Sequence, residues 1–152
     1  ATVADENGKT FFAKWIKGIK QKSQQSKILY DKLRHLKKAV HVALPQIIEY
    51  DWDENQNAYC IIFENKEAQT LEDILADIQP TYFLKGIEQV IDCLKNLQQN
   101  FRLSHGDITP ANILVDNNLD FYLIDFGLSD ITATLSQDAT EEIFARTFAA
   151  PE

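Results

Sequence analysis

Residues 105–127 read HGDITPANILVDNNLDFYLIDFG and carry three polar side chains whose types and spacing could support chemistry. Asp107 and Asn112 are five residues apart, and Asp125 follows 13 residues after Asn112. Carboxylate and amide oxygens suit Mg²⁺, which proteins commonly hold with one or two carboxylates and substrate phosphates. The trio therefore indicates phosphate chemistry. The alternative is that the Asp and Asn side chains only satisfy the backbone of a turn.

Two short apolar segments are expected to position this trio. NILV and FYLID read as strands, and the polar stretch DNNLD between them reads as their turn. Asp107 would then lie on a loop, and Asn112 and Asp125 would lie at strand ends. Such a hairpin would bring the three side chains together at one mouth.

The segments upstream predict two further hairpins and one helix. TVA, the turn DENGK and TFFAKWI indicate a hairpin with a two-residue Asn-Gly turn and Gly8 at its tip. QIIEYDW and AYCIIFE, separated by DENQN, indicate the second hairpin. Residues 24–40 predict an amphipathic helix that ends near residues 40–43. Its expected buried stripe is Ile28, Leu29, Leu33, Leu36 and Val40.

Two helices are predicted between the second hairpin and the polar trio. Thr70 is expected to cap a short helix with the sequence LEDILADI, and Pro80-Thr81 opens a longer one that runs to about Gln99. The expected buried face of the longer helix is Ile87, Val90, Ile91, Leu94 and Leu97.

Composition favours a globular protein with one core of respectable size, since 45% of the 152 residues are hydrophobic. No run of 18 apolar residues and no signal-peptide pattern occurs, so we expect a cytoplasmic protein without a membrane segment. Cys60 and Cys93 lie in apolar contexts and are expected to be buried thiols rather than a disulfide framework.

Charge is distributed unevenly along the chain. Residues 1–38 carry 10 Lys/Arg and 3 Asp/Glu, whereas residues 39–152 carry 5 and 20, so the two parts have net charges of +7 and −15. A basic segment can bind nucleic acid, but this one lacks interleaved aromatic residues for base stacking. We therefore expect a solvated basic face and no nucleic-acid partner.

The motifs around the trio resemble those of the protein kinase family. His105, Asp107 and Asn112 match the catalytic-loop pattern, residues 125–127 read Asp-Phe-Gly, and residues 150–152 read Ala-Pro-Glu. The resemblance implies an α+β, two-lobed protein-kinase-like fold, present in part. Residues 1–64 would form a partial small lobe, and residues 65–152 a partial large lobe with the hinge and activation segment.

The resemblance also implies roles for individual residues and two ligands, ATP and Mg²⁺. Asp107 resembles the base that accepts the substrate hydroxyl proton, and Asn112 and Asp125 resemble the metal-holding groups. Lys14, in FFAKW, resembles the lysine that binds the α and β phosphates, with Lys17 as the second choice. His105 and Phe126 are expected to be core residues that hold the loop.

A hinge is implied by the segment IIFENKEAQTLEDIL. Phe63 resembles the gatekeeper, and Glu64 and Lys66 would flank the adenine edge, where backbone groups would read the base. Leu114, two residues after Asn112, resembles the apolar floor of the nucleotide site, a place that a buried strand leucine would also fill.

The sequence departs from the family pattern at several positions. Helix 24–40 contains no Glu to pair with Lys14, which leaves Asp31 as the one available carboxylate; the alternative is that this Asp faces solvent. Gly106 replaces the Arg before the catalytic Asp, so phosphorylation of the activation segment is not expected to be a switch. Thr109 replaces a Lys that steadies the transferred phosphate, and Phe12 replaces an Ala and could crowd the adenine pocket.

These features favour an ATP-dependent serine/threonine kinase that acts on a protein. A nucleotide-binding scaffold without transfer activity and a small-molecule kinase of the same fold remain as alternatives. The Gly-rich loop that would cover the phosphates and the rest of the large lobe are absent from the sequence. We therefore expect residues 1–152 to be inactive by themselves.

Overall fold

A computed structural model describes residues 1–126 of the chain, which form two compact units. The first unit contains residues 1–40 and 45–65, and the second contains residues 41–44 and the chain from Lys66. The expectations for Gly127 and for residues 150–152 lie outside the described residues.

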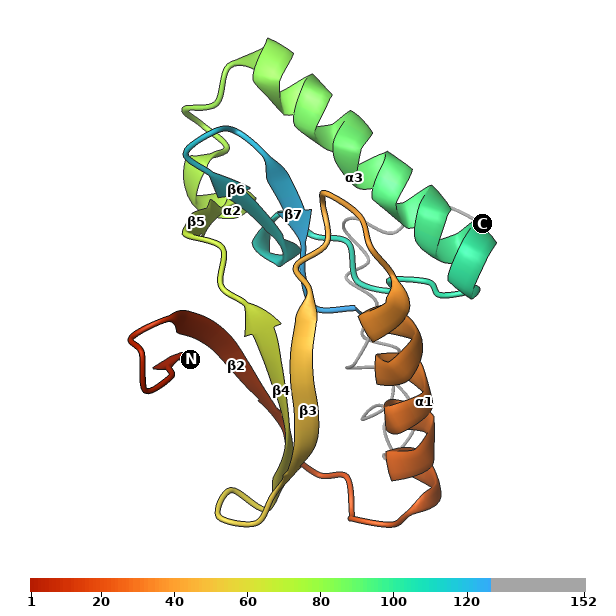
Figure 1. Cartoon of the computed structure of the whole chain (residues 1–152). Helices are drawn as coiled ribbons and strands as arrows, with labels where there is room; N and C mark the ends of the chain where they lie inside the picture. Colours follow the sequence, from red (N-terminus) through yellow and green to blue (C-terminus); the bar gives the residue numbers. More distant parts are fainter. Residues whose placement is uncertain (127–152) are drawn as a thin grey trace. The chain divides into compact units, whose positions relative to one another are not determined.

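The first unit is built on an antiparallel four-stranded sheet with the strand order β1-β2-β4-β3 (Figure 1). The strands are β1 (Thr2–Ala4), β2 (Thr10–Ile16), β3 (Ile47–Asp53) and β4 (Ala58–Glu64). β2 and β4 are rich in the aromatic and β-branched residues that fit a half-buried pleated surface. Both predicted hairpins are confirmed.

The turn between β1 and β2 differs from the predicted two-residue Asn-Gly turn. The Gly8 N–H donates to the Asp5 carbonyl at 3.0 Å, and the Asp5 carboxylate accepts the N–H groups of Asn7 and Lys9, each at 2.9 Å. Gly8 has a φ of +80°, whereas Asn7 keeps a negative φ. A type I′ turn needs positive φ at both central residues. The Asp5 side chain instead stabilises a wider loop.

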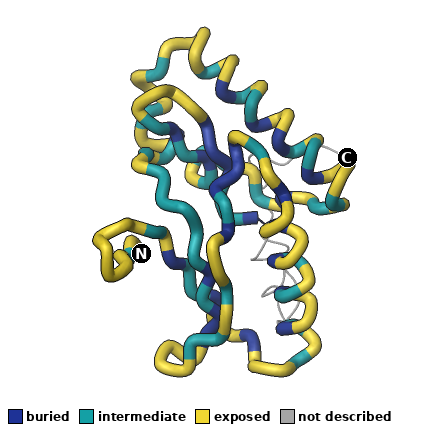
Figure 2. Tube along the Cα trace, in the orientation of Figure 1, coloured by how far each residue is buried: buried dark blue, intermediate teal, exposed yellow. Residues whose placement is uncertain are grey.

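Helix α1 (Gln24–Lys38) begins after Ser23, whose Oγ accepts the Ser26 N–H at 3.2 Å. Three of the predicted stripe residues, Leu29, Leu33 and Leu36, are buried on one side of the helix (Figure 2). Two predictions are wrong: Ile28 is 52% exposed and Val40 is 76% exposed. Ile28 lies about 100° around the helix from Leu29, and Val40 follows the helix end at Ala39.

The second unit contains helices α2 (Leu71–Ile74) and α3 (Pro80–Phe101) and the short 3₁₀ helix η1 (Pro110–Asn112). It also contains an antiparallel sheet of β5 (Ala68–Thr70), β6 (Ile113–Asp116) and β7 (Phe121–Leu123), in that order. The predicted cap is confirmed, because Thr70 Oγ1 accepts the Asp73 N–H at 3.2 Å.

Helix α3 packs against β7, and this contact forms the core of the second unit. The buried residues of α3 are Gly86, Val90, Cys93 and Leu97. They face the side of the β6–β7 hairpin that carries the fully buried Phe121 and Leu123. The predicted face is partly wrong, since Ile91 is 44% exposed and Ile87 and Leu94 are half-buried. The buried row follows the spacing i, i+4, i+7, i+11 from Gly86, a residue that carries no hydrophobic signal.

Both cysteines are free thiols. Cys93 is fully buried, and burial raises its pKa to about 11, while Cys60 is half-buried with a pKa raised by the same cause. The helices of residues 1–126 include none with the length and apolar character needed to span a bilayer.

Residues 41–44 form a strap that leaves the first unit between α1 and β3 and belongs to the second unit. Ala43 is fully buried, and its carbonyl accepts the Leu123 N–H at 2.9 Å. His41 Nδ1 accepts the Ala43 N–H at 3.1 Å, so the neutral ring carries its proton on Nε2, which lies 3.1 Å from Asp92 Oδ2. The strap is thus attached to both β7 and α3.

Candidate active site

Asn112 holds Asp107 through two hydrogen bonds. Its Nδ2 group donates to the Asp107 carbonyl at 3.0 Å and to Asp107 Oδ2 at 2.9 Å. Both side chains are half-buried, so water screens these bonds only in part. The carboxylate is therefore fixed in orientation while it remains accessible, as a proton acceptor must be.

Helix η1 positions Asn112 at its end. Pro110 begins the helix, where its missing N–H costs nothing, and the Asn112 N–H donates to the Thr109 carbonyl at 3.0 Å. The Asn112 carbonyl in turn accepts the Ile124 N–H at 2.9 Å. This last bond joins Asn112 to the residue directly before Asp125, so all three members of the trio belong to one local structure.

Asp125 adopts a left-handed backbone conformation with a φ of +67°. This conformation costs an L-residue other than Gly roughly 1–2 kcal/mol, so the surrounding contacts must enforce it. The next residue, Phe126, is buried and its ring lies 4.9 Å from the His105 ring. The anchored Phe126 and the bonded Ile124 hold Asp125 from both sides.

His105 links the loop that carries Asp107 to the same segment. Its Nε2 donates to the Ile124 carbonyl at 2.8 Å, and its Nδ1 accepts the Asp107 N–H at 3.2 Å. The ring is buried, with 3% exposure. His105 and Phe126 are therefore core residues, as the sequence predicted, and they order the loop.

The donor atoms near Asn112 suit a hard cation. Because Nδ2 donates to Asp107, the amide Oδ1 is the atom that could bind a metal, and Asp125 would supply a carboxylate. Within residues 1–126 no group of three or more His, Cys, Asp or Glu side chains forms a metal cluster. Two protein ligands completed by phosphate oxygens and water are what Mg²⁺ commonly uses.

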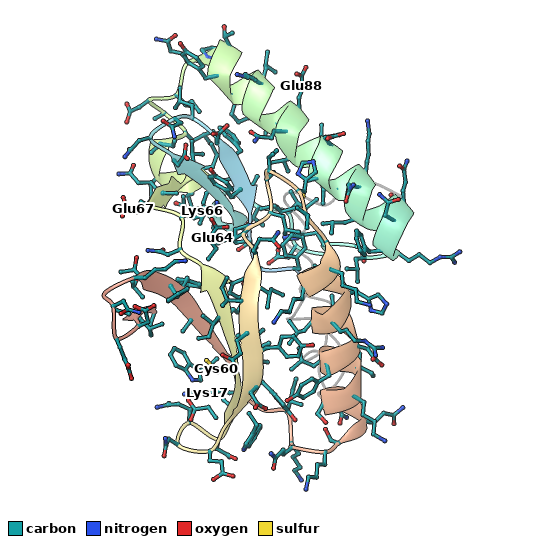
Figure 3. All side chains as sticks on the ribbon, in the orientation of Figure 1. Lys17, Cys60, Glu64, Lys66, Glu67 and Glu88 are labelled. Atoms are coloured by element: carbon teal, nitrogen blue, oxygen red, sulfur yellow. The ribbon has the colours of Figure 1, made fainter. Side chains whose placement is uncertain are left out.

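Lys14 lies in β2 on the face of the sheet that α1 covers. It is opposite Ile61, which is opposite Tyr50, and directly opposed residues share a face. The Tyr50 ring contacts Tyr30 of α1 with ring centroids 5.4 Å apart. Lys14 is half-buried there, whereas Lys17 follows the end of β2 and is exposed (Figure 3).

Asp31 does not point toward that face. Its carboxylate forms an ion pair with Arg34 at 2.8 Å, and its side chain is 65% exposed. The side of α1 that packs on the sheet presents Ser26 and three leucines. The sequence left open whether Asp31 pairs with Lys14 or faces solvent, and in the structure it faces solvent.

Phe63 and Phe12 lie directly opposite each other on β4 and β2, on the same face as Lys14. Phe12 is 40% exposed, so its ring forms part of the surface of the first unit beside Lys14. Glu64 ends β4 and is half-buried. Figure 3 shows Glu64, Lys66 and Glu67 in succession along the connector that leaves this strand.

Lys66 and Leu114 lie on one face of the second unit's sheet. Leu114 is opposite Tyr122, and Lys66 Nζ is 4.9 Å from the centroid of the Tyr122 ring. The Tyr122 hydroxyl donates to Asp116 Oδ2 at 3.0 Å. Ile113 and Val115 point to the opposite face, which is the buried one.

Gly106 and Thr109, the two positions in this loop that depart from the kinase pattern, have defined local conformations. Gly106 has a φ of +81°, a conformation that Gly adopts without strain. Thr109 is half-buried, and its carbonyl accepts the Asn112 N–H that closes η1. Neither residue supplies a positive charge.

Sequence reasoning missed two features of this region. The strap at residues 41–44 reaches β7 two residues before Asp125, and the Lys66–Tyr122 contact fixes the connector to the sheet. Neither has a periodic or motif signal. The one cue was the charge and aromatic character of Lys66 and Tyr122, which allow a cation–π contact once the fold brings them together.

Comparisons with known proteins identify a family model and several relatives that are similar to this chain. The family model described as "Protein kinase domain" matches residues 1–152. Serine/threonine-protein kinase PrkC of Bacillus subtilis is 28% identical over 103 residues, which cover 65% of this chain and 16% of that protein. Cyclin-dependent kinase D-1 of Arabidopsis thaliana is 27% identical over 151 residues, which cover 97% of this chain and 37% of that protein.

A solved structure supports the same fold. The kinase domain of maize SIRK1, a sucrose-induced receptor kinase crystallised with AMP-PNP, matches with a TM-score of 0.70 and 22% identity. The match covers 84% of this chain and 46% of that chain. The chain spans less than half the length of each of these relatives. With the family model matching all 152 residues, the chain belongs to the protein kinase family.

Proposed function

We propose that the protein containing this chain is an ATP-dependent serine/threonine kinase that phosphorylates a protein. The observation that carries the proposal is the pinned Asp107–Asn112 pair, joined through Ile124 to the strained Asp125. Backbone strain at Asp125 and the part-buried hydrogen bonds between Asn112 and Asp107 hold one amide and two carboxylates in place. This arrangement is favourable for binding and orienting phosphate groups.

In this proposal Asp107 accepts the proton of the substrate hydroxyl. Its carboxylate is held by Asn112, so its free lone pairs point to one side and can align the hydroxyl oxygen for in-line attack. Asn112 Oδ1 and Asp125 would hold Mg²⁺, which would neutralise charge on the phosphates. Lys14 would bind the α and β phosphates from the first unit.

A protein acceptor is supported by one of the relatives reported above, since PrkC is named as a serine/threonine-protein kinase. Position 109 is Thr rather than Lys, so the transferred phosphate has one positively charged side chain fewer to stabilise it. We therefore expect turnover at the slow end of the range for kinases. Gly106 supports regulation that does not depend on phosphorylation of the activation segment, since no Arg is present there to bind a phosphate.

A second candidate function is a nucleotide-binding scaffold without transfer. The specific observation that favours it is on α1, where the packed side of the helix carries leucines and Asp31 faces solvent. Helix α1 contains no Glu, whereas the family pattern pairs a helix Glu with the phosphate-binding lysine, so nucleotide binding would persist without efficient transfer.

One pair of measurements separates the candidates. Full-length protein is incubated with radiolabelled ATP, Mg²⁺ and peptide libraries that contain Ser, Thr or Tyr, and nucleotide binding is measured in parallel by calorimetry. The kinase proposal predicts labelled Ser or Thr peptides and Mg²⁺-dependent binding that Asp125→Ala weakens at least about tenfold. Asp120→Asn, an exposed change in the β6–β7 turn, is the matched control. Binding without any transfer would instead establish the scaffold.

A further inference from the structure

Helix α1 and the loop before it form the one strongly basic surface within residues 1–126. Residues 17–38 contain eight Lys or Arg and a single acid, Asp31, whereas the remainder of the chain is strongly acidic. All eight belong to the first unit, and seven of them are exposed. A positive surface on a protein of net charge −8 is a specific electrostatic feature.

Three of these side chains form a row on the exposed side of α1. Lys27, Arg34 and Lys38 fall within about 40° of one another around the helix. At 1.5 Å per residue they are spaced by about 10 Å and about 6 Å along its axis. We call these three residues the basic row. Among residues 1–126, neither lysine of the row is in an ion pair.

Arg34 is the exception in the row, and its pairing is weak. Its partner Asp31 lies one turn away, and the two side chains are 61% and 65% exposed. Exposed pairs of this kind are screened by water and salt and stabilise little. A carboxylate from another chain could therefore replace Asp31 and use the bidentate geometry that Arg favours.

An exposed apolar side chain lies beside the row. Ile28 follows Lys27 and is 52% exposed, because it falls outside the buried stripe of leucines. A surface that combines three cations with one aliphatic side chain suits a partner that combines carboxylates with an apolar residue. Alternate residues of an extended peptide are about 6.7 Å apart, close to the spacing between Arg34 and Lys38.

The other polyanions fit this surface less well. Single-stranded nucleic acid would need exposed aromatic rings, but Tyr30 of α1 packs against Tyr50 and Tyr59 and donates its hydroxyl to Asp51. A long nucleic acid or an anionic membrane would also need a longer basic surface than the roughly 16 Å of helix that the row spans. A short peptide stays within about one Debye length of the row, roughly 8 Å at physiological salt.

We propose that the exposed side of α1, with the basic row and Ile28, binds a short acidic polypeptide segment that carries an apolar side chain. This interaction surface goes beyond the proposed kinase function, and it requires neither nucleotide nor metal. Binding there would hold α1 by its outer side while the leucines hold it to the sheet.

The test uses the full chain and a fluorescein-labelled peptide of sequence EDELEDE, with QNQLQNQ as the uncharged control probe. Fluorescence anisotropy is measured without ATP. The proposal predicts saturable binding of the acidic probe that weakens at least about tenfold in Lys27→Glu/Arg34→Glu/Lys38→Glu. It also predicts that binding of the acidic probe weakens when NaCl is raised from about 50 mM to about 500 mM, because the Debye length shortens.

A matched control carries Lys9→Glu/Lys85→Glu/Lys95→Glu, three exposed lysines outside α1 that give the same change in net charge. This variant should bind within about twofold of the parent, whereas an equal loss would mean unspecific attraction and would overturn the proposal. The neutral variant Lys27→Gln/Arg34→Gln/Lys38→Gln, checked by circular dichroism, repeats the test without charge reversal.

The proposal is also overturned if EDELEDE and QNQLQNQ bind alike, or if no binding is seen. Two further probes test the other polyanions: a single-stranded RNA of comparable charge and phosphatidylserine vesicles. If either binds through the basic row more tightly than the acidic peptide does, the surface belongs to that class of partner and the peptide assignment is wrong.

Discussion

Asn112 serves two neighbours at once, since its amide donates to Asp107 while its carbonyl accepts the Ile124 N–H. A substitution that keeps the shape but changes the charge should therefore reveal the role of Asp107. In Asn112→Asp, two carboxylates would lie about 3 Å apart, and repulsion between them raises the pKa of the pair.

We predict that Asn112→Asp shifts the acidic limb of the pH profile of kcat/KM upward by about one pH unit or more. A raised pKa means that a higher pH is needed to ionise the base, so activity is lost first on the acidic side. Initial rates of phosphate transfer between pH 5 and 9 would measure the limb. Asn118→Asp, an exposed change in the β6–β7 turn, should leave it in place. An unshifted limb in Asn112→Asp would contradict the contact between the side chains at positions 107 and 112.

The two thiols give a second prediction for single residues. Cys93 is fully buried with a pKa of about 11, and Cys60 is half-buried with a smaller rise. Because the thiolate is the reactive form, Cys60 should react first with a thiol reagent at pH 8, and Cys93 should react only on unfolding. Mass spectrometry after timed labelling distinguishes the two sites. Equal labelling of both thiols in the native chain would contradict the packing of α3.

Helices and strands were predictable here where one face of each element carries a regular pattern. All three hairpins and both long helices occur near their predicted positions, because turn signals and the 3.6-residue period are local properties. The choice of buried face was less predictable. Ile28 and Ile91 are as hydrophobic as their buried neighbours, and only tertiary packing decides that Leu29 and Cys93 face inward.

Gly86 shows the same limit and allows a test of the α3–β7 contact. It lies inside α3, where Gly costs about 1 kcal/mol relative to Ala, yet a Cβ at this position would overlap the Phe121 ring. We predict that Gly86→Ala destabilises the chain by about 1–3 kcal/mol despite the better helix propensity, because overpacking outweighs it.

Urea unfolding would measure this change, with Gln99→Ala on the exposed side of α3 as the control. The control should change the free energy of unfolding by less than about 0.5 kcal/mol. A Gly86→Ala variant that is more stable than the parent would show that α3 and Phe121 are not packed as described.

At the scale of the whole chain, the strap at residues 41–44 was beyond prediction from sequence. The sequence pattern predicts only that the helix ends near residues 40–43, and the fold shows that Ala43 is buried with the second unit while both flanking elements belong to the first. The candidate site was easier to predict, because the order and spacing of its motifs can be read directly from the sequence. The partner of Lys14 was not, since α1 carries no Glu and orientation of Asp31 depends on packing.

We predict that Ala43→Asp detaches the strap, because a buried charge without a partner is strongly destabilising. The neighbouring change Val42→Asp is the control, since Val42 is 71% exposed. Hydrogen exchange at the Leu123 amide, which donates to the Ala43 carbonyl, is the readout. Protection should fall at least about tenfold in Ala43→Asp and stay unchanged in Val42→Asp. Equal protection in both variants would show that the strap does not hold β7.

The proposed enzymatic function rests most directly on Asp107. Asp107→Asn keeps the size of the side chain and its position beside Asn112 but removes the proton acceptor, whereas Asp120→Asn makes the same chemical change on an exposed turn. The measurement is the rate of γ-phosphate transfer from ATP to a Ser/Thr peptide by the full-length protein. We predict a loss of about 100-fold or more in Asp107→Asn and parental activity in Asp120→Asn. Equal rates in the parent and Asp107→Asn would contradict the assignment.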